Sequence, residues 1–164
     1  MSTKTTGDLA STKLITVAVD ASMAEAQKLM NDNHFRHLPV TNKMGDIIGI
    51  LSDRDIQRAL TTTKSEHSPE LIYEMPKDFK VKDFMSWPAH KISSECSVRE
   101  TAMRILNEKI SALIVEDKNE KFRGIITTDD LIRYLVSILE KDPGRLKLAL
   151  DAVFEDFSPV RNWA

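Results

Sequence analysis

The feature that most limits the fold of this 164-residue chain is an internal duplication. A shift of 75 residues brings identical residues of the two halves into register, with no gap between Ser22 and Leu60. The pairs include Ser22 with Ser97, Glu25 with Glu100, Leu38 with Leu113, Val40 with Val115, Gly49 with Gly124, Asp55 with Asp130 and Arg58 with Arg133. Solenoid repeats have periods of roughly 20 to 50 residues, so we expect two copies of one small module instead of an array.

Each copy predicts the order strand, helix, strand, strand, helix, which is an α+β arrangement. Short segments of β-branched and polar residues, followed later by apolar runs, predict strands at residues 15–19, 38–40, 47–51, 91–94, 112–115 and 122–126. A serine followed three residues later by glutamate forms a capping box in each copy, at Ser22 and at Ser97. A helix should begin at each of these serines, and a second helix of each copy near Ser52 and Thr127.

Four segments follow from this pattern: a first repeat at residues 5–62, a connector at 63–80, a second repeat at 81–141 and an amphipathic helix at 145–158. One copy is too small to bury a comfortable core alone, whereas two packed copies reach ordinary domain size. The last segment places apolar residues at helical spacing, at Leu146, Ala149, Leu150, Val153, Phe154 and Phe157. We expect it to pack on the module or across a dimer, with docking to a separate partner as the alternative.

Charge and cysteine usage exclude several functional classes. Lysine and arginine number 23 against 25 for aspartate and glutamate, and this balance makes nucleic acid an unlikely partner. The single cysteine, Cys96, excludes an intramolecular disulfide and a cysteine-based zinc site, and a cytoplasmic location fits it best. We expect no signal peptide, no membrane span and no metal site.

The junctions between the third strand and the second helix of each copy contain the polar residues best suited to binding. Residues 49–55 and 124–130 share the pattern glycine, two apolar residues, serine or threonine, two variable residues and aspartate. The glycine allows a close approach to the backbone, and the hydroxyl lies at a helix start, where free amides favour an anion. The aspartate can accept hydrogen bonds from the two hydroxyls of a ribose. Alternatively, each pair of hydroxyl and acid is only a helix cap, but its repetition favours a binding site.

These junctions, the segment Arg-His-Leu-Pro-Val at residues 36–40 and the segment Val-Lys-Asp-Phe-Met at residues 81–85 together resemble a pair of cystathionine-β-synthase (CBS) domains, also called a Bateman module. The resemblance covers residues 5–140. It implies two tandem β-α-β-β-α repeats related by a pseudo-twofold axis, with a C-terminal helical extension added in this chain. It also implies a cleft for adenosine-containing ligands, AMP, ADP, ATP or S-adenosylmethionine, and assembly into a homodimer.

Carried over by position, the resemblance makes Asp55 and Asp130 the ribose ligands, with Ser52 and Thr127 near the ribose or phosphate. It assigns contacts with adenine to the two first-strand segments, that is to Ile15, Thr16, Val17, His90, Lys91 and Ile92. It places Arg36 and His37 at phosphate, and the expected nucleotide-binding set also contains Pro39, Arg54 and Ala112, with Arg54 and Lys91 as further phosphate candidates. The second copy has Ser111 and Ala112 where the first has Arg36 and His37, so we expect one dominant site.

Two functions remain open at this stage. The first is a standalone regulatory module, with no required cofactor, that binds an adenine nucleotide and signals to an unidentified regulated protein by a conformational change. The second is a constitutive dimerisation or scaffold module without ligand. Arg36 and His37, taken as lying beside Ser52 and Asp55, favour the first. We expect no enzymatic activity, because the chain lacks a plausible set of acid, base and nucleophile.

Overall fold

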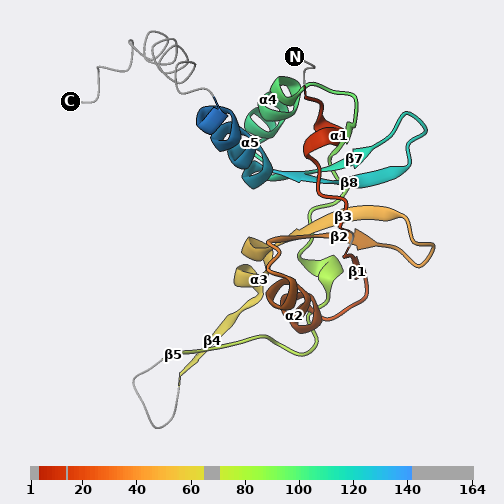
Figure 1. Ribbon diagram of the computed structural model, residues 1–164. Coiled ribbons are helices and arrows are strands. Elements are labelled where there is room, and N and C mark those ends of the chain that lie inside the picture. Colours follow the sequence, from red (N-terminus) through yellow and green to blue (C-terminus); the bar gives the residue numbers. More distant parts are fainter. Residues whose placement is uncertain (1–3, 14, 65–70, 142–164) are drawn as a thin grey trace.

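The computed structural model describes residues 4–13, 15–64 and 71–141, which form two lobes that each contain a three-stranded sheet (Figure 1). The sheets are formed by β1 (Val17–Ala18), β2 (His37–Thr41) and β3 (Ile47–Ser52), and by β6 (Lys91–Ser93), β7 (Ala112–Glu116) and β8 (Phe122–Thr127). In both, the first strand pairs parallel with the second and the second antiparallel with the third. The register repeats as well, because Val17 lies opposite Val40 and Ile92 opposite Val115. The predicted duplication and strand order are therefore confirmed.

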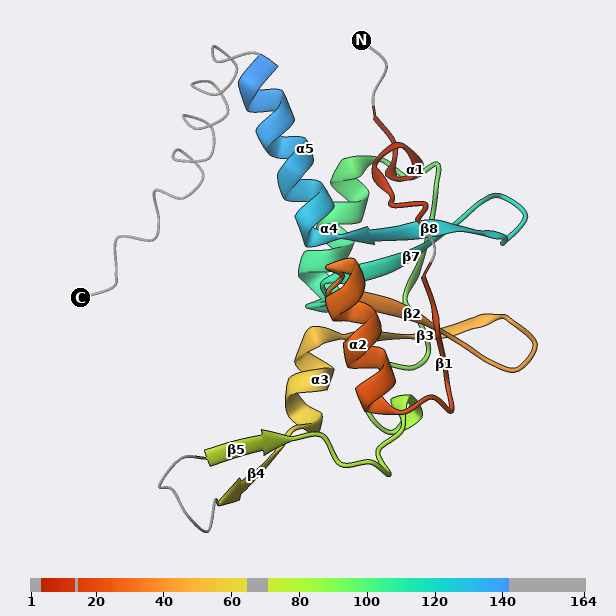
Figure 2. The ribbon, with the colours of Figure 1, turned by 60° about the horizontal axis from the view of Figure 1, so that its bottom comes forward.

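Each repeat has one helix after its first strand and one after its third: α2 (Met23–Asn33) and α3 (Asp53–Ala59) in the first repeat, α4 (Val98–Glu108) and α5 (Thr128–Lys141) in the second. Figure 2 shows these four helices in one column beside the two sheets. Both predicted serine caps accept a hydrogen bond from the backbone three residues on, but only Ser97 forms the complete box with its glutamate side chain. No helix within the described ranges is long and apolar enough to cross a membrane. The helix predicted at 145–158 lies outside those ranges.

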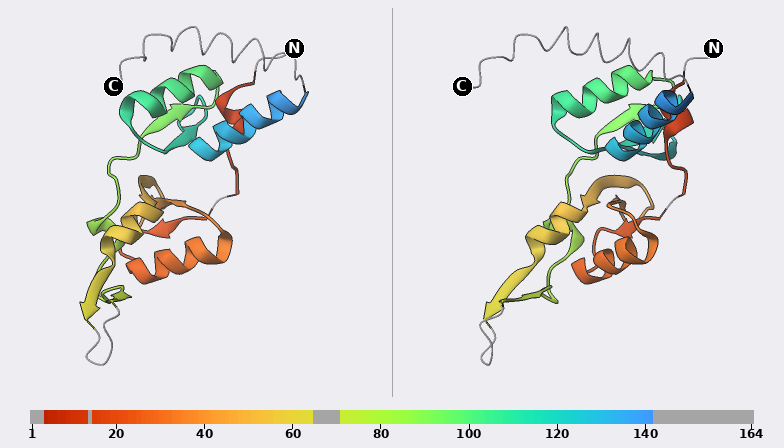
Figure 3. Two further views of the ribbon diagram at one scale, coloured as in Figure 1. Left: turned by 90° about the vertical axis from the view of Figure 1, so that its left-hand side faces the viewer. Right: turned by 60° about the vertical axis from the view of Figure 1, so that its left-hand side comes forward.

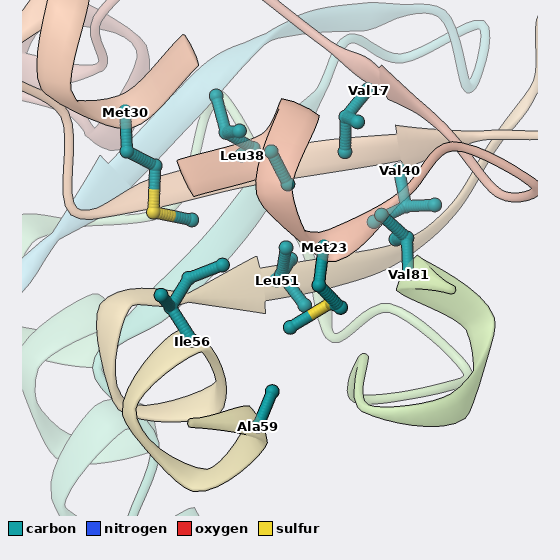
Figure 4. Close-up of a cluster of buried hydrophobic side chains, with 10 residues drawn as sticks. Val17, Met23, Met30, Leu38, Val40, Leu51, Ile56, Ala59 and Val81 are labelled. Carbon is teal, nitrogen blue, oxygen red and sulfur yellow. The ribbon is translucent and has the colours of Figure 1, made fainter. Parts of the chain in front are cut away.

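Apolar side chains form a core in each repeat and a third cluster that joins the repeats. Figure 4 shows the first core, in which Met23, Leu38 and Leu51 have no exposed surface. Each such side chain contributes about 1.5 to 3 kcal/mol of burial free energy. The third cluster contains Ile50 of β3 with Ala112 and Ile114 of β7. Because this cluster includes both sheets, the two repeats form one packed unit.

The segment that leads into each repeat packs against the other repeat. Helix α1 (Thr6–Leu9), drawn in red in Figure 1, lies with the second repeat, where Thr6 is fully buried and its hydroxyl shares a hydrogen bond with Thr101. The 3-10 helix η1 (Val81–Asp83) contributes Val81 to the core of the first repeat. Residues 5–11 therefore pack on the second sheet, although they precede the first sheet in the sequence.

Two repeated glycines, Gly49 and Gly124, allow these lead-in segments to pass close to a strand of the repeat on which they pack. Ser11 pairs with Ile125, and a Cβ added at Gly124 would lie 2.4 Å from the carbonyl oxygen of Ser11. At Gly49 an added Cβ would lie 2.8 Å from the carbonyl oxygen of Ser86. The close backbone approach expected from the sequence is thus made by the chain itself.

The connector contains a hairpin that the sequence analysis did not predict. Strands β4 (Thr61–Lys64) and β5 (Leu71–Glu74) pair antiparallel and extend away from both three-stranded sheets (Figures 1 and 3). Three consecutive threonines in β4 and the sequence Leu-Ile-Tyr in β5 favour strands, because β-branched and aromatic residues suit a pleated backbone. The few apolar residues of this segment had suggested a plain connector instead.

Candidate functional site

Two cavities of about 270 and 360 Å³, which we call cleft I and cleft II, lie between the repeats. Cleft I is lined by Ser11, Lys13, Ile15, His34, Phe35, Arg36, His37, Pro39, Phe122, Ile125, Thr127, Asp129, Asp130 and Arg133. Cleft II is lined by His37, Ile50, Ser52, Arg54, Asp55, Arg58, Ser86, Ala89, His90, Lys109, Ile110, Ser111 and Ala112. A shift of 75 residues converts most of one set into the other, so the two cavities are equivalent positions of a duplicated structure. Their sizes suit a small molecule.

Each cleft takes residues from both repeats. In cleft I, the start of β2 with Arg36 faces the junction that contains Thr127 and Asp130. In cleft II, the start of β7 faces the junction that contains Ser52 and Asp55. This corrects the grouping of Arg36 with Ser52 and Asp55, because the pseudo-twofold relation places the second strand of one repeat opposite the junction of the other. Among the described residues, His37 alone lines both cavities.

Asp55 and Asp130 both cap the helices in which they lie, which is the alternative to a binding role given above. The two aspartates differ in the contacts of the carboxylate oxygen that is not used for capping. In both, Oδ2 accepts hydrogen bonds from the backbone and the hydroxyl of the residue three positions earlier, Ser52 or Thr127. Asp55 Oδ1 also accepts a hydrogen bond of 3.0 Å from Arg58. Asp130 Oδ1 has no partner in the described part of the chain. Capping therefore uses one oxygen of each aspartate and leaves the other oxygen of Asp130, a residue that lines cleft I, available to a ligand.

Charged groups at the mouth of cleft I are already paired across the two repeats. The guanidinium of Arg36 forms an ion pair with Asp129, although 93 residues separate them in the sequence. Nearby, His37 Nε2 lies 2.8 Å from the hydroxyl of Ser111. Burial lowers the pKa of His37 below its usual value near 6.5, so this ring is neutral at pH 7. At pH 7, His37 can therefore form hydrogen bonds with a ligand but adds no positive charge.

Four of the predicted first-strand residues line neither cleft. Val17 and Ile92 are buried in the two cores, and Thr16 lines a separate cavity beside the β2–β3 loop. Lys91 pairs with Glu116 at 2.7 Å. Alternation along β6 places Lys91 on the face opposite Ile92, whereas Ile15 and His90, which line the clefts, precede β1 and β6. Ile15 lines cleft I, and the equivalent residue of the second repeat, His90, lines cleft II. His90 Nδ1 lies 2.6 Å from a carboxylate oxygen of Glu108.

The remaining predicted residues all lie at a cleft: Pro39, Thr127 and Asp130 at cleft I, and Arg54 and Ala112 at cleft II. Sequence reasoning missed several residues that line them, namely Lys13, Phe35, Ile50, Arg58, Lys109, Ile125 and Arg133. A signal for two of these was present, because Arg58 and Arg133 are a repeated pair three residues after the repeated aspartates. On a helix this spacing places both side chains on one face.

The family model described as CBS domain matches residues 7–62 and 81–137. The chain belongs to the CBS domain family. Its two repeats are a tandem CBS pair, and the duplicated strand order and composite clefts are the structure of that pair. A CBS domain-containing protein of Dictyostelium discoideum is 31% identical over 137 residues, which cover 82% of this chain and 93% of that protein.

Solved CBS pairs have the same fold. The CBS domain pair of protein MJ0100, in complex with 5′-methylthioadenosine and S-adenosylmethionine, superposes with a TM-score of 0.67 at 21% identity and covers 83% of this chain and 98% of that chain. CBSX2 in complex with AMP has a TM-score of 0.62 at 22% identity, with 82% and 98% covered. A homoserine O-acetyltransferase of Methanosalsum zhilinae is 29% identical, but this chain spans only 23% of its length. CBS pairs therefore occur as separate chains and as parts of larger proteins.

Proposed function

We propose that this CBS pair is a regulatory, non-catalytic module that binds an adenine-containing nucleotide between its repeats and signals to a partner protein through a change in conformation. The observation that carries the proposal is the composite construction of both clefts, in which each ribose-binding candidate and the strand facing it come from different repeats. A ligand that contacts both repeats favours one arrangement of the repeats over others. Binding then shifts the population that a partner meets.

Each part of such a ligand has a counterpart in cleft I. Ile15, Pro39 and Ile125 supply apolar surface for an adenine ring. The open Oδ1 of Asp130 is an acceptor for ribose hydroxyls, and Arg133, which forms no ion pair within the described residues, lies at the same cavity for the 5′ substituent. The ligands named with the similar solved pairs, 5′-methylthioadenosine, S-adenosylmethionine and AMP, all contain adenosine. We propose AMP, ADP, ATP or S-adenosylmethionine as the ligand class, with no cofactor required.

Titration calorimetry of the full chain with each of these four compounds tests the proposal. We expect saturable binding of at least one of them and no binding of the matching uridine or cytidine compounds, which lack the purine. Heat denaturation of the purified protein followed by chromatography should also release any nucleotide retained from the cell. If none of the four compounds binds and no adenine compound is released, the ligand-binding function is contradicted.

A second candidate, a constitutive dimerisation module, is favoured by an exposed apolar surface on α4 and α5. We call it the α4/α5 face, and it consists of Met103, Leu106, Ile132, Leu135 and Val136, which are 42 to 68% exposed. Exposed large apolar side chains on neighbouring helices are typical of a surface that meets another protein, and a symmetric homodimer is the commonest solution. A homodimer can also bind a ligand. A scaffold function without ligand is therefore supported only if the chain forms a dimer and no adenine compound binds.

Replacing Leu106 and Ile132 together with glutamate should convert a homodimer to a monomer, because two buried charges at each copy of the surface oppose association. Sedimentation equilibrium of the full chain at micromolar concentration measures the change. Met44→Glu is the matched control, since Met44 is 83% exposed on the β2–β3 loop, away from this surface. A monomeric unsubstituted chain, or a doubly substituted chain that remains dimeric, contradicts the assignment of this surface.

A further inference from the structure

The two clefts differ at two equivalent positions that determine their charge. Position 36 of cleft I is arginine and its equivalent in cleft II is Ser111, whereas position 129 of cleft I is aspartate and its equivalent in cleft II is Arg54. In cleft I the arginine and the aspartate of these positions neutralise each other in an ion pair. In cleft II the same two positions hold a hydroxyl and an exposed cation instead.

The residues that line cleft II include three cations and a single carboxylate. Arg54 and Lys109 both line it, and within the described residues neither side chain forms an ion pair or hydrogen bond. Arg58 adds a third cation, and Asp55, to which it is paired, is the one carboxylate among the lining residues. Cleft II therefore has three cations for one carboxylate, and Arg54 is the cation that cleft I lacks at the equivalent position, residue 129.

Cleft I is less positive, because it has a second carboxylate for the same number of cations. Its three cations, Lys13, Arg36 and Arg133, face two carboxylates, Asp129 and Asp130. Arg36 is occupied by Asp129, and the ammonium group of Lys13 lies 5.3 Å from the centre of the Phe35 ring. A phosphate that approaches Arg36 must displace Asp129, and until then it is repelled by that carboxylate.

We infer that the two clefts bind different classes of adenosine compound, a nucleoside di- or triphosphate in cleft II and an adenosine derivative without a phosphate chain in cleft I. This inference rests on the proposed nucleotide-binding function. Arg54 is the residue that selects the phosphate chain in cleft II, because charge-assisted hydrogen bonds to phosphate are stronger than neutral ones. Asp129 excludes phosphate from cleft I. The expectation that the Arg36 side would dominate phosphate binding is thereby reversed, since Arg36 already has an anionic partner.

The internal repeat supplies the variants for a test, because each residue can be exchanged for its own equivalent. Arg54→Asp gives cleft II the residue of cleft I, and Asp129→Arg does the reverse. Arg99→Asp is the control, since Arg99 is exposed, lines neither cleft and changes the net charge by the same amount. ATP and adenosine are the probes, and calorimetry gives the affinity and the number of sites for each.

Arg54→Asp should weaken ATP binding by about tenfold or more, the effect of losing one charge-assisted contact, and leave adenosine binding within about twofold. Asp129→Arg should raise the number of ATP sites per chain from one to two. Equal weakening of ATP and adenosine by Arg54→Asp, or loss of ATP affinity in Arg99→Asp as large as in Arg54→Asp, overturns the inference but leaves the nucleotide function standing. If the unsubstituted chain binds neither ATP nor adenosine, the inference is overturned, and the test with all four compounds decides the nucleotide function separately.

Discussion

Replacement of Gly124 with alanine is expected to lower the free energy of unfolding by about 2 to 3 kcal/mol, the upper part of the range for overpacking a tight site. The new Cβ would meet the carbonyl oxygen of Ser11 at 2.4 Å and its carbonyl carbon at 3.1 Å. These are backbone atoms that cannot rotate away. Ser11 is also held by two hydrogen bonds to Ile125, of 2.9 and 3.1 Å, so relief of the clash requires both to break.

Urea unfolding of the full chain measures this effect, and two other glycines calibrate it. Gly49→Ala should destabilise the chain somewhat less, because its closest backbone contact, with Ser86, is longer at 2.8 Å. Gly45→Asn is the mild control, since Gly45 has open space around it and asparagine tolerates its positive φ of 87°. A Gly124→Ala chain that unfolds at the same urea concentration as the unsubstituted chain would contradict a role for this glycine in the crossing.

Much of the fold could be predicted because its determinants are local or repeated. Capping serines and apolar runs locate the helices and strands within short windows of sequence, and the duplication doubles each signal. The crossing of α1 could not be predicted in this way. Only one of its four residues, Leu9, has a large apolar side chain, and its partners, such as Cys96 and Thr101 around Thr6, lie 90 and 95 residues further along the chain. No periodicity in such a short segment indicates which sheet it meets.

The candidate site, like the fold, has features that the sequence predicts and features that it does not. Ser52, Asp55, Thr127 and Asp130 could be found because they recur at equal spacing in both copies. The sequence could not show which of these residues face Arg36, because that depends on how the two sheets pack. Asp129 occupies a position of the motif that differs between the copies, so a search for repeated residues discards it. The differences between the copies, and not their shared residues, determine the charge of each cleft.

Asparagine at position 130 is expected to remove about half of the stabilisation that adenosine confers on the fold. A ligand at about 100 times its dissociation constant raises the free energy of unfolding by about 2.7 kcal/mol. Loss of the carboxylate contact with the ribose should weaken binding about tenfold, since hydrogen bonds to charged groups contribute about 1.5 to 3 kcal/mol. At the same ligand concentration, a tenfold weaker affinity leaves about 1.4 kcal/mol.

Asparagine is preferable to alanine here because its amide oxygen can still accept the capping hydrogen bonds that Thr127 donates to Asp130 Oδ2. The fold then changes little, and the thermal shift with adenosine, measured against each variant's own unliganded melt, reports the ligand contact. Asp55→Asn is the matched control, because Asp55 Oδ1 already accepts a hydrogen bond from Arg58. If cleft I is the adenosine site, the shift must fall for Asp130→Asn and stay near the unsubstituted value for Asp55→Asn. An equal fall in both variants would mean that adenosine does not distinguish the open carboxylate oxygen from the occupied one.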